Sequence, residues 1–96
     1  MMVLITYDVN TESEAGKRRL RQVAKICEDH GQRVQFSVFE CLLEPALWVK
    51  LRSKLIGVVD PSIDSLRFYF LGSSWQNRVE HVGAKPAYDP EGPLIL

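Results

Sequence analysis

A run of seven residues near the N-terminus constrains the fold of this chain more than any other feature. Val3 to Val9 is almost entirely apolar or β-branched, and the turn-forming residues Asp8 and Asn10 close it. A continuous apolar run of this length is typical of a strand buried on both faces of a sheet. We therefore predict a central strand here, followed by a polar loop over 11–16.

Two later segments have the residue spacing of amphipathic helices. The first covers 17–30, and Gly31 after it is expected to cap its C-terminus. The second begins at Pro45, a residue suited to the first position of a helix, and ends near 59–61. The apolar stripe expected on this second helix consists of Leu47, Leu51, Leu55 and Val58.

The remaining segments have strand patterns. Residues 33–43 alternate with a period of two except at Phe39, so either one kinked strand or two strands fit this run. Further strands are expected at 65–71 and 78–82. The order predicts an α+β fold, a ferredoxin-like βαββαβ arrangement with an extra C-terminal strand and both helices on one face of an antiparallel sheet.

The length of 96 residues is enough for one domain. We assign this domain to 1–82 and a C-terminal arm to 83–96. The formal net charge is +0, so bulk charge favours neither a nucleic-acid nor a membrane partner. Cys27 and Cys41 lack metal-binding spacing and are expected to be buried thiols. Because there is no signal-peptide pattern and no run of ~20 apolar residues, we expect a soluble cytoplasmic protein.

Asp8 is the main candidate for a functional residue. It ends the buried strand next to a crossover, where ligands of open α/β sheets gather. An Asx turn that holds the loop at Asn10 explains the same residue without any ligand. A lone carboxylate is a poor metal site, but a two-fold axis would supply the same residue from a second subunit. A catalytic role for Asp8 therefore depends on a dimer.

The first helix carries its charges in an unusual order. Basic residues crowd its start while Glu28 and Asp29 lie near its end, which opposes the helix macrodipole. An anionic partner such as a phosphate backbone would offset this cost. The alternative is a solvated face with Glu12 and Glu14 as local counter-ions. The basic residues are Lys17, Arg18, Arg19, Arg21 and Lys25.

Two residues of the 33–43 run have open interpretations. Arg33 shares a strand face with Gln35 and Ser37, and this face is either a polar groove or the solvent side. Phe39 is out of phase with its neighbours, and we expect it to pack in the core or in an interface rather than to stack on bases.

The end of the chain gives a second indication of a dimer. Three prolines separate an apolar tail from the body of the chain. Such a tail either frays or adds as a strand to the edge of another subunit's sheet, and we predict strand exchange. The tail residues are Leu94, Ile95 and Leu96.

Taken together, these segments resemble the CRISPR-associated protein 2 family. The matching pieces are the strand VLITYDV (3–9), the basic run over 17–25, the segment RVQFSVFE (33–40) and the ending EHVGAKP (80–86). The resemblance covers nearly the whole chain, and RVQFSVFE is its most specific element.

The resemblance implies a homodimer whose two Asp8 residues face each other and bind a divalent metal, Mg²⁺ or Mn²⁺. Members are described as metal-dependent endonucleases of antiviral defence that act on RNA or duplex DNA. They are also described as the non-catalytic centre of a spacer-acquisition complex with the CRISPR-associated integrase. Tyr7 and Phe39 would support the site. The residues that would bind nucleic acid are Arg18, Arg21, Lys25 and Arg33.

Three functions are therefore open. The first is a phosphodiesterase that holds Mg²⁺ between two Asp8 carboxylates and cleaves single-stranded RNA or duplex DNA, although no general base is evident. The second is a non-catalytic dimeric scaffold that binds DNA and docks the integrase. The third is a small-molecule-sensing domain, which the fold permits because fold does not fix function. The charge order of the first helix argues against the third.

Overall fold

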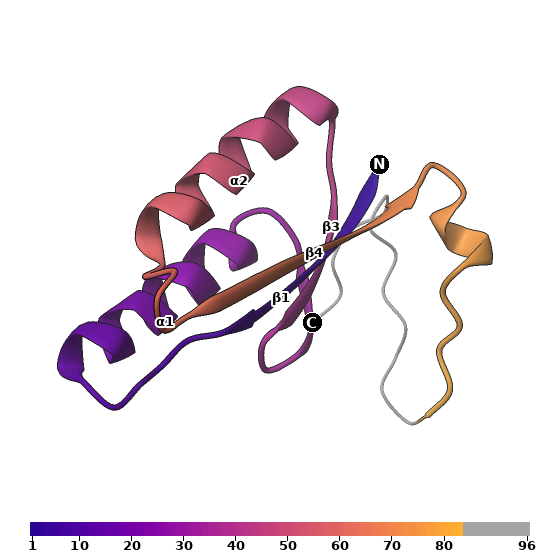
Figure 1. Ribbon diagram of the computed structural model, residues 1–96. Coiled ribbons are helices and arrows are strands. Elements are labelled where there is room, and N and C mark those ends of the chain that lie inside the picture. The colour runs from indigo at the N-terminus through magenta and orange to yellow at the C-terminus, as the bar shows by residue number, and fades with distance from the viewer. Residues whose placement is uncertain (84–96) are drawn as a thin grey trace.

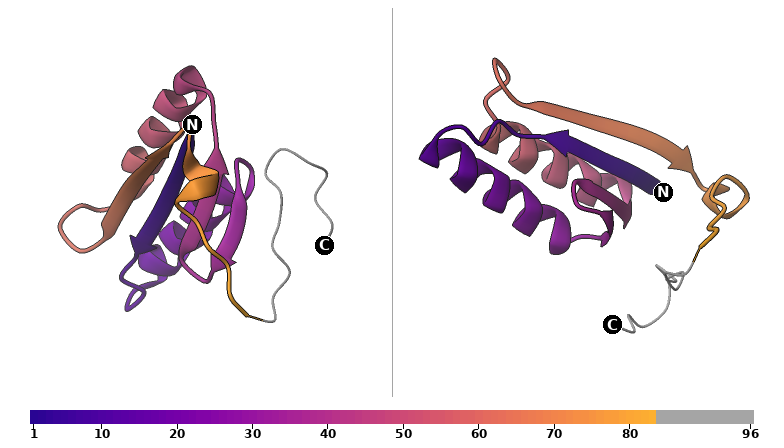
Figure 2. Two further views of the ribbon diagram at one scale, coloured as in Figure 1. Left: turned by 90° about the vertical axis from the view of Figure 1, so that its right-hand side faces the viewer. Right: turned by 90° about the horizontal axis from the view of Figure 1, so that it is seen from below.

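Two helices cover one face of a four-stranded sheet in this computed structural model, which describes residues 1–83 (Figure 1). Both helices lie on the same side of the sheet when the molecule is turned (Figure 2). No helix within the described residues is long and apolar enough to span a bilayer. The elements are β1 (Met2–Asp8), α1 (Glu14–Glu28), β2 (Gln32–Gln35), β3 (Val38–Leu42), α2 (Pro45–Val58), β4 (Ser65–Gly72) and the 3₁₀ turn η1 (Trp75–Asn77).

The sheet has the strand order β2-β3-β1-β4, and every neighbouring pair is antiparallel. β1 therefore lies in the interior of the sheet, as the apolar run at the N-terminus predicts. The element order and the helices on one face confirm the predicted ferredoxin-like α+β class. β4 is an edge strand of the described sheet.

The hydrophobic core lies between the sheet and the two helices. Alternate residues of β1 point toward the helices because side chains of a strand alternate between its two faces. Both cysteines are buried here as free thiols, as expected, and burial raises the pKa of each to about 12. The main core residues are Val3, Ile5, Tyr7, Val23, Cys27, Phe39, Cys41, Trp48, Leu51 and Leu55.

The ends of α1 differ from the sequence-based expectation. The helix begins at Glu14, inside the predicted loop, because the Ser13 hydroxyl accepts a hydrogen bond from the Gly16 amide at 3.0 Å and caps the first turn. The helix is capped at its other end by Asp29 rather than by Gly31. Gly31 has a different role, because a Cβ there would collide with Cys41 Sγ and with the carbonyl of residue 40.

The 33–43 run forms two strands joined by a turn at 36–37. This turn shifts the phase of alternation, which is why Phe39 is out of step with the residues before it. In α2 the prediction is wrong at one position, since Trp48 is buried whereas Leu47 is 40% exposed. Trp48 makes edge-to-face ring contacts with Phe68 and Phe70 of β4, and these contacts direct that face of α2 onto the sheet.

The strand predicted over 78–82 does not form. The chain turns at Gly72, which has a φ of 76°, and continues through η1 into irregular backbone. Val79 and Val82 are exposed, so no apolar face draws this segment onto the described sheet. The tail residues Leu94, Ile95 and Leu96 lie outside the described residues, and strand exchange stays a prediction.

Candidate nucleic-acid interface

Asp8 lies at the carboxyl end of β1 with its side chain exposed. It pairs across the sheet with Ser65 of β4. Among residues 1–83 its carboxylate has no hydrogen bond and no ion pair. The Asx interpretation of Asp8 is wrong, because Asn10 itself makes that turn by accepting the Glu12 amide at 3.0 Å. Asp8 is therefore free to act on a ligand.

Asp8 supplies only part of the oxygen ligands that a divalent ion needs. Within the described residues no three His, Cys, Asp or Glu side chains gather to hold a metal. Mg²⁺ keeps several waters and takes one or two carboxylates together with phosphate oxygens, and an open carboxylate fits that mode of binding. Within the described residues, one chain thus supplies one carboxylate at this position.

Tyr7 and Phe39 shape the structure beside Asp8 from within the core. Phe39 is fully buried and stacks on Tyr7 with ring centroids 6.2 Å apart, which confirms the expected packing role. Burial raises the pKa of the Tyr7 phenol, whose hydroxyl donates to the Phe36 carbonyl at 3.3 Å. Tyr7 therefore fixes the turn between β2 and β3 rather than meeting solvent.

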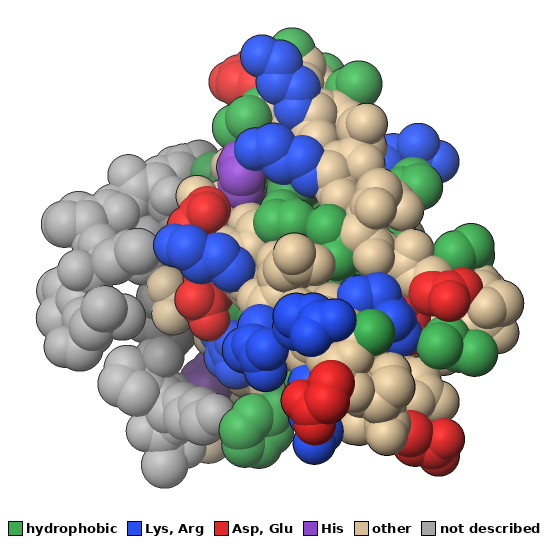
Figure 3. Space-filling model, turned by 90° about the vertical axis from the view of Figure 1, so that its left-hand side faces the viewer, with side chains coloured by type: hydrophobic (Ala, Val, Ile, Leu, Met, Phe, Trp, Pro, Cys, Tyr) green, Lys and Arg blue, Asp and Glu red, His purple; other side chains and the backbone are tan. Residues whose placement is uncertain are grey.

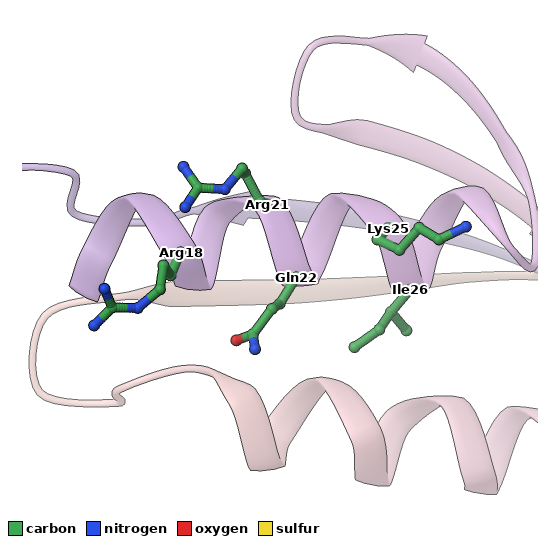
Figure 4. Close-up of a pocket in the computed structure, with 5 residues that line it drawn as sticks. All are labelled: Arg18, Arg21, Gln22, Lys25 and Ile26. Atoms are coloured by element: carbon green, nitrogen blue, oxygen red, sulfur yellow. The ribbon is translucent and has the colours of Figure 1, made fainter. Parts of the chain in front are cut away.

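The outer side of α1 carries a shallow basic groove (Figure 4). Arg18 and Arg21 have no ion-pair partner within residues 1–83, whereas Lys25 pairs with Asp29 at 2.9 Å. The space-filling view shows the basic side chains gathered across this part of the surface (Figure 3). The groove is lined by Arg18, Arg21, Gln22, Lys25 and Ile26.

Two other basic candidates, Lys17 and Arg33, are held in ion pairs. Lys17 pairs with Glu14 at 3.3 Å, so the solvated-face interpretation is correct for that residue. Arg33 pairs with Glu28 at 2.9 Å and places its guanidinium carbon 5.0 Å from the centroid of the Phe39 ring. Arg33 does not line the groove on α1. The structure thus brings together three of the four residues predicted to bind nucleic acid.

Asp64 is a structural residue of this region that sequence reasoning missed. Its buried carboxylate accepts hydrogen bonds from the Asn10 amide at 3.0 Å and from the Asp60 amide at 2.8 Å. Arg19 pairs with it at 2.8 Å, and this hydrogen bond is the main reason that the pKa of Asp64 is lowered to about 2. No local signal marks Asp64, because Arg19 lies 45 residues away in the sequence.

Residues 1–83 thus form a ferredoxin-like domain in which a carboxylate without a partner among these residues ends a central strand and the first helix carries a basic face. The chain belongs to the family of the CRISPR associated protein Cas2, whose model matches residues 1–79.

Relatives along the whole chain support this assignment. A protein of Chlorobaculum tepidum named CRISPR-associated endoribonuclease Cas2 is 70% identical over 96 residues, which cover 100% of both chains. One of Halalkalibacterium halodurans, named CRISPR-associated endonuclease Cas2, is 53% identical with the same coverage. The crystal structure of Streptococcus pyogenes Cas2 at pH 6.5 superposes with a TM-score of 0.75 and 59% identity, covering 86% of this chain and 100% of that one.

Proposed function

We propose that this chain is a metal-dependent endonuclease that cleaves RNA or DNA as a homodimer in the cytoplasm, in the spacer-acquisition stage of antiviral defence. The observation that carries the proposal is the exposed carboxylate of Asp8 at the end of the central strand, which has no partner among residues 1–83. The names of the relatives, endoribonuclease and endonuclease, support the same reaction class.

Asp8 from each subunit would hold Mg²⁺ or Mn²⁺. A bound ion of this kind polarises a phosphate oxygen and lowers the pKa of a bound water. Arg18 and Arg21, which have no ion-pair partner in the described chain, would bind the phosphate backbone of the substrate. Asp64 does not serve as the general base, because its carboxylate is buried and engaged by Arg19.

The proposal is tested by Asp8→Asn in the full chain, with Glu12→Gln as a control that alters an exposed acid in the next loop. Cleavage of labelled single-stranded RNA and duplex DNA is followed with and without Mg²⁺. We expect Asp8→Asn to lose more than the roughly 10–100-fold that indirect metal-site changes cost, with an unchanged urea midpoint. Cleavage by Asp8→Asn at the rate of the unaltered chain overturns the proposal.

The dimer is tested separately by sedimentation of the full chain and of a chain that ends at Gly83. Strand exchange through Leu94, Ile95 and Leu96 predicts a dimer for the first and a shift toward monomer for the second. A shortened chain that stays fully dimeric rules out the arm as the dimer contact.

A non-catalytic scaffold is the second candidate, and the groove on α1 favours it. Arg18 and Arg21, which have no ion-pair partner among the described residues, lie on the outer side of a helix, where duplex DNA can reach them, and they need no metal. If the protein is such a scaffold, the Asp8→Asn variant should retain duplex binding, docking of the CRISPR-associated integrase and spacer acquisition in cells. Loss of acquisition in an Asp8→Asn strain with unchanged protein level excludes it.

A further inference from the structure

The most exposed large apolar side chain among residues 1–83 is an aromatic ring at the tip of the β2–β3 hairpin. Phe36 is 89% exposed. The turn that carries it is two residues long, so the ring stands outside the sheet. Since a Phe ring has no polar atom, water cannot compensate this exposure, and a partner with a flat apolar face would gain from covering it.

The strand register places the hairpin tip at the end of β1 that carries Asp8. β1 and β3 pair so that Ile5 lies opposite Phe39 and Thr6 opposite Val38. The pairing continues past the last bridge, because the Tyr7 amide donates to the Ser37 carbonyl at 3.1 Å. Phe36 comes directly before Ser37 in the turn, so the hairpin tip lies at the end of β1 that carries Asp8.

The tip that presents the ring is anchored at its backbone. The Tyr7 hydroxyl donates to the Phe36 carbonyl at 3.3 Å, and the Tyr7 ring is itself buried against Phe39. Both contacts use atoms other than the Phe36 side chain, so a substitution there leaves them in place. A fixed backbone also lowers the entropy that the ring loses when it is covered.

We propose that Phe36 is a stacking platform for an unpaired nucleobase of the strand whose phosphate lies at Asp8. This inference rests on the proposed function, since it needs nucleic acid at Asp8. Every base has a π-face that stacks on an aromatic side chain, so the contact is tolerant of sequence. The bases of a duplex already stack on one another, so the platform selects single strands.

The test uses the full chain with Ca²⁺ in place of Mg²⁺, so that a divalent ion can occupy the site at Asp8, and a single-stranded RNA that contains one 2-aminopurine, whose fluorescence is quenched by stacking. Phe36→Leu keeps an apolar side chain but removes the π-face. Phe70→Leu is the control, because it makes the same change at an aromatic side chain that is 61% exposed and lies at the opposite end of the sheet. Phe36→Trp keeps a stacking surface.

We expect Phe36→Leu to weaken binding of the single strand by about 5- to 150-fold and to remove the quenching. Phe36→Trp should retain both, and Phe70→Leu should change neither. Binding of the same sequence as a duplex should be insensitive to Phe36→Leu.

Unchanged affinity and quenching in Phe36→Leu, while the unaltered chain binds RNA, overturns this inference and leaves the proposed function standing. Equal losses for the duplex and the single strand also overturn it. A shift from dimer to monomer on Phe36→Leu overturns it too, since the ring then packs against a second copy. If the unaltered chain binds no oligonucleotide, the proposed function fails with it.

Discussion

Arg19 donates two hydrogen bonds to Asp64, from Nε to Oδ2 at 2.8 Å and from Nη2 to Oδ1 at 3.3 Å. This ion pair ties the first turns of α1 to the segment just before β4. Because the same carboxylate also accepts the Asn10 amide, it fixes the loop that joins Asp8 to α1. The two parts of the proposed interface, the strand end and the basic helix, are thus held relative to each other by one buried side chain.

Asp64→Ala should destabilise the fold by about 1–3 kcal/mol, because it leaves two backbone amides and the partly exposed Arg19 guanidinium without their acceptor. Asp29→Ala is the matched control. It removes the exposed partner of Lys25 and should cost at most about 1 kcal/mol. Urea unfolding followed by circular dichroism measures both. Equal losses of unfolding free energy in the two variants would show that the Arg19–Asp64 pair stabilises the fold no more than an exposed pair does.

Acid should weaken the fold through the same carboxylate. The pKa of Asp64 lies at about 2 in the folded chain against an ordinary value of 3.8. A lowered pKa means that its contribution is fully present above pH ~4 and is lost as the pH falls toward 2. The free energy of unfolding should therefore decline between pH 4 and 2, and Asp64→Asn should flatten that decline. An identical pH dependence in Asp64→Asn would contradict the assignment.

The basic groove on α1 should give nucleic-acid binding its salt dependence. Replacing both Arg18 and Arg21 with Gln should weaken duplex binding and make the slope of log K against log salt less steep by about 1.8, which is about 0.9 for each lost phosphate contact. Lys50→Gln with Lys54→Gln on α2 changes the net charge equally and should have a smaller effect, since neither lines the groove. Fluorescence anisotropy at several salt concentrations measures both pairs.

The α1 variants should not unfold the protein. Arg21 lies four residues from both Lys17 and Lys25, so its neutralisation relieves like-charge repulsion of about 0.2–0.5 kcal/mol per pair. A lower urea midpoint in the variant with both arginines replaced would mean that its weaker binding results from unfolding and not from lost phosphate contacts.

Two glycines should respond oppositely to the same substitution. Gly31→Ala pushes a methyl group into Cys41 Sγ and a backbone carbonyl, and should cost about 1–3 kcal/mol. Gly57 lies in α2 with no heavy atom within 4 Å of a Cβ built there, so Gly57→Ala should stabilise by about 0.5–1 kcal/mol. Thermal unfolding measures the stability of both variants. A Gly31→Ala variant as stable as the parent would refute the packing role of Gly31 against β3.

Local sequence patterns predicted helices and strands well where a few neighbouring residues are enough to define the element. The apolar run that ends at Asp8 predicted the interior position of β1, and Pro45 predicted the start of α2. The phase of Phe39 predicted packing in the core or in an interface, and the residue is buried in the core.

Features that depend on distant contacts were not predictable in this way. Trp48 faces the core instead of Leu47 because Phe68 and Phe70 of β4 contact it. Gly31 looked like a helix cap, although its constraint comes from β3. Asp64 was missed, because nothing near it in sequence shows that Arg19 faces it.

The hydroxyl of Tyr7 bonds to the main chain of residue 36 and not to its side chain. The hairpin tip is therefore built independently of the residue that it presents. Any side chain compatible with a tight turn can occupy this position without a change to the scaffold. If the ring of Phe36 stacks on a base as inferred above, a change of this one side chain alters which ligands the protein prefers, which makes this tip a natural starting point for engineering the specificity of related proteins.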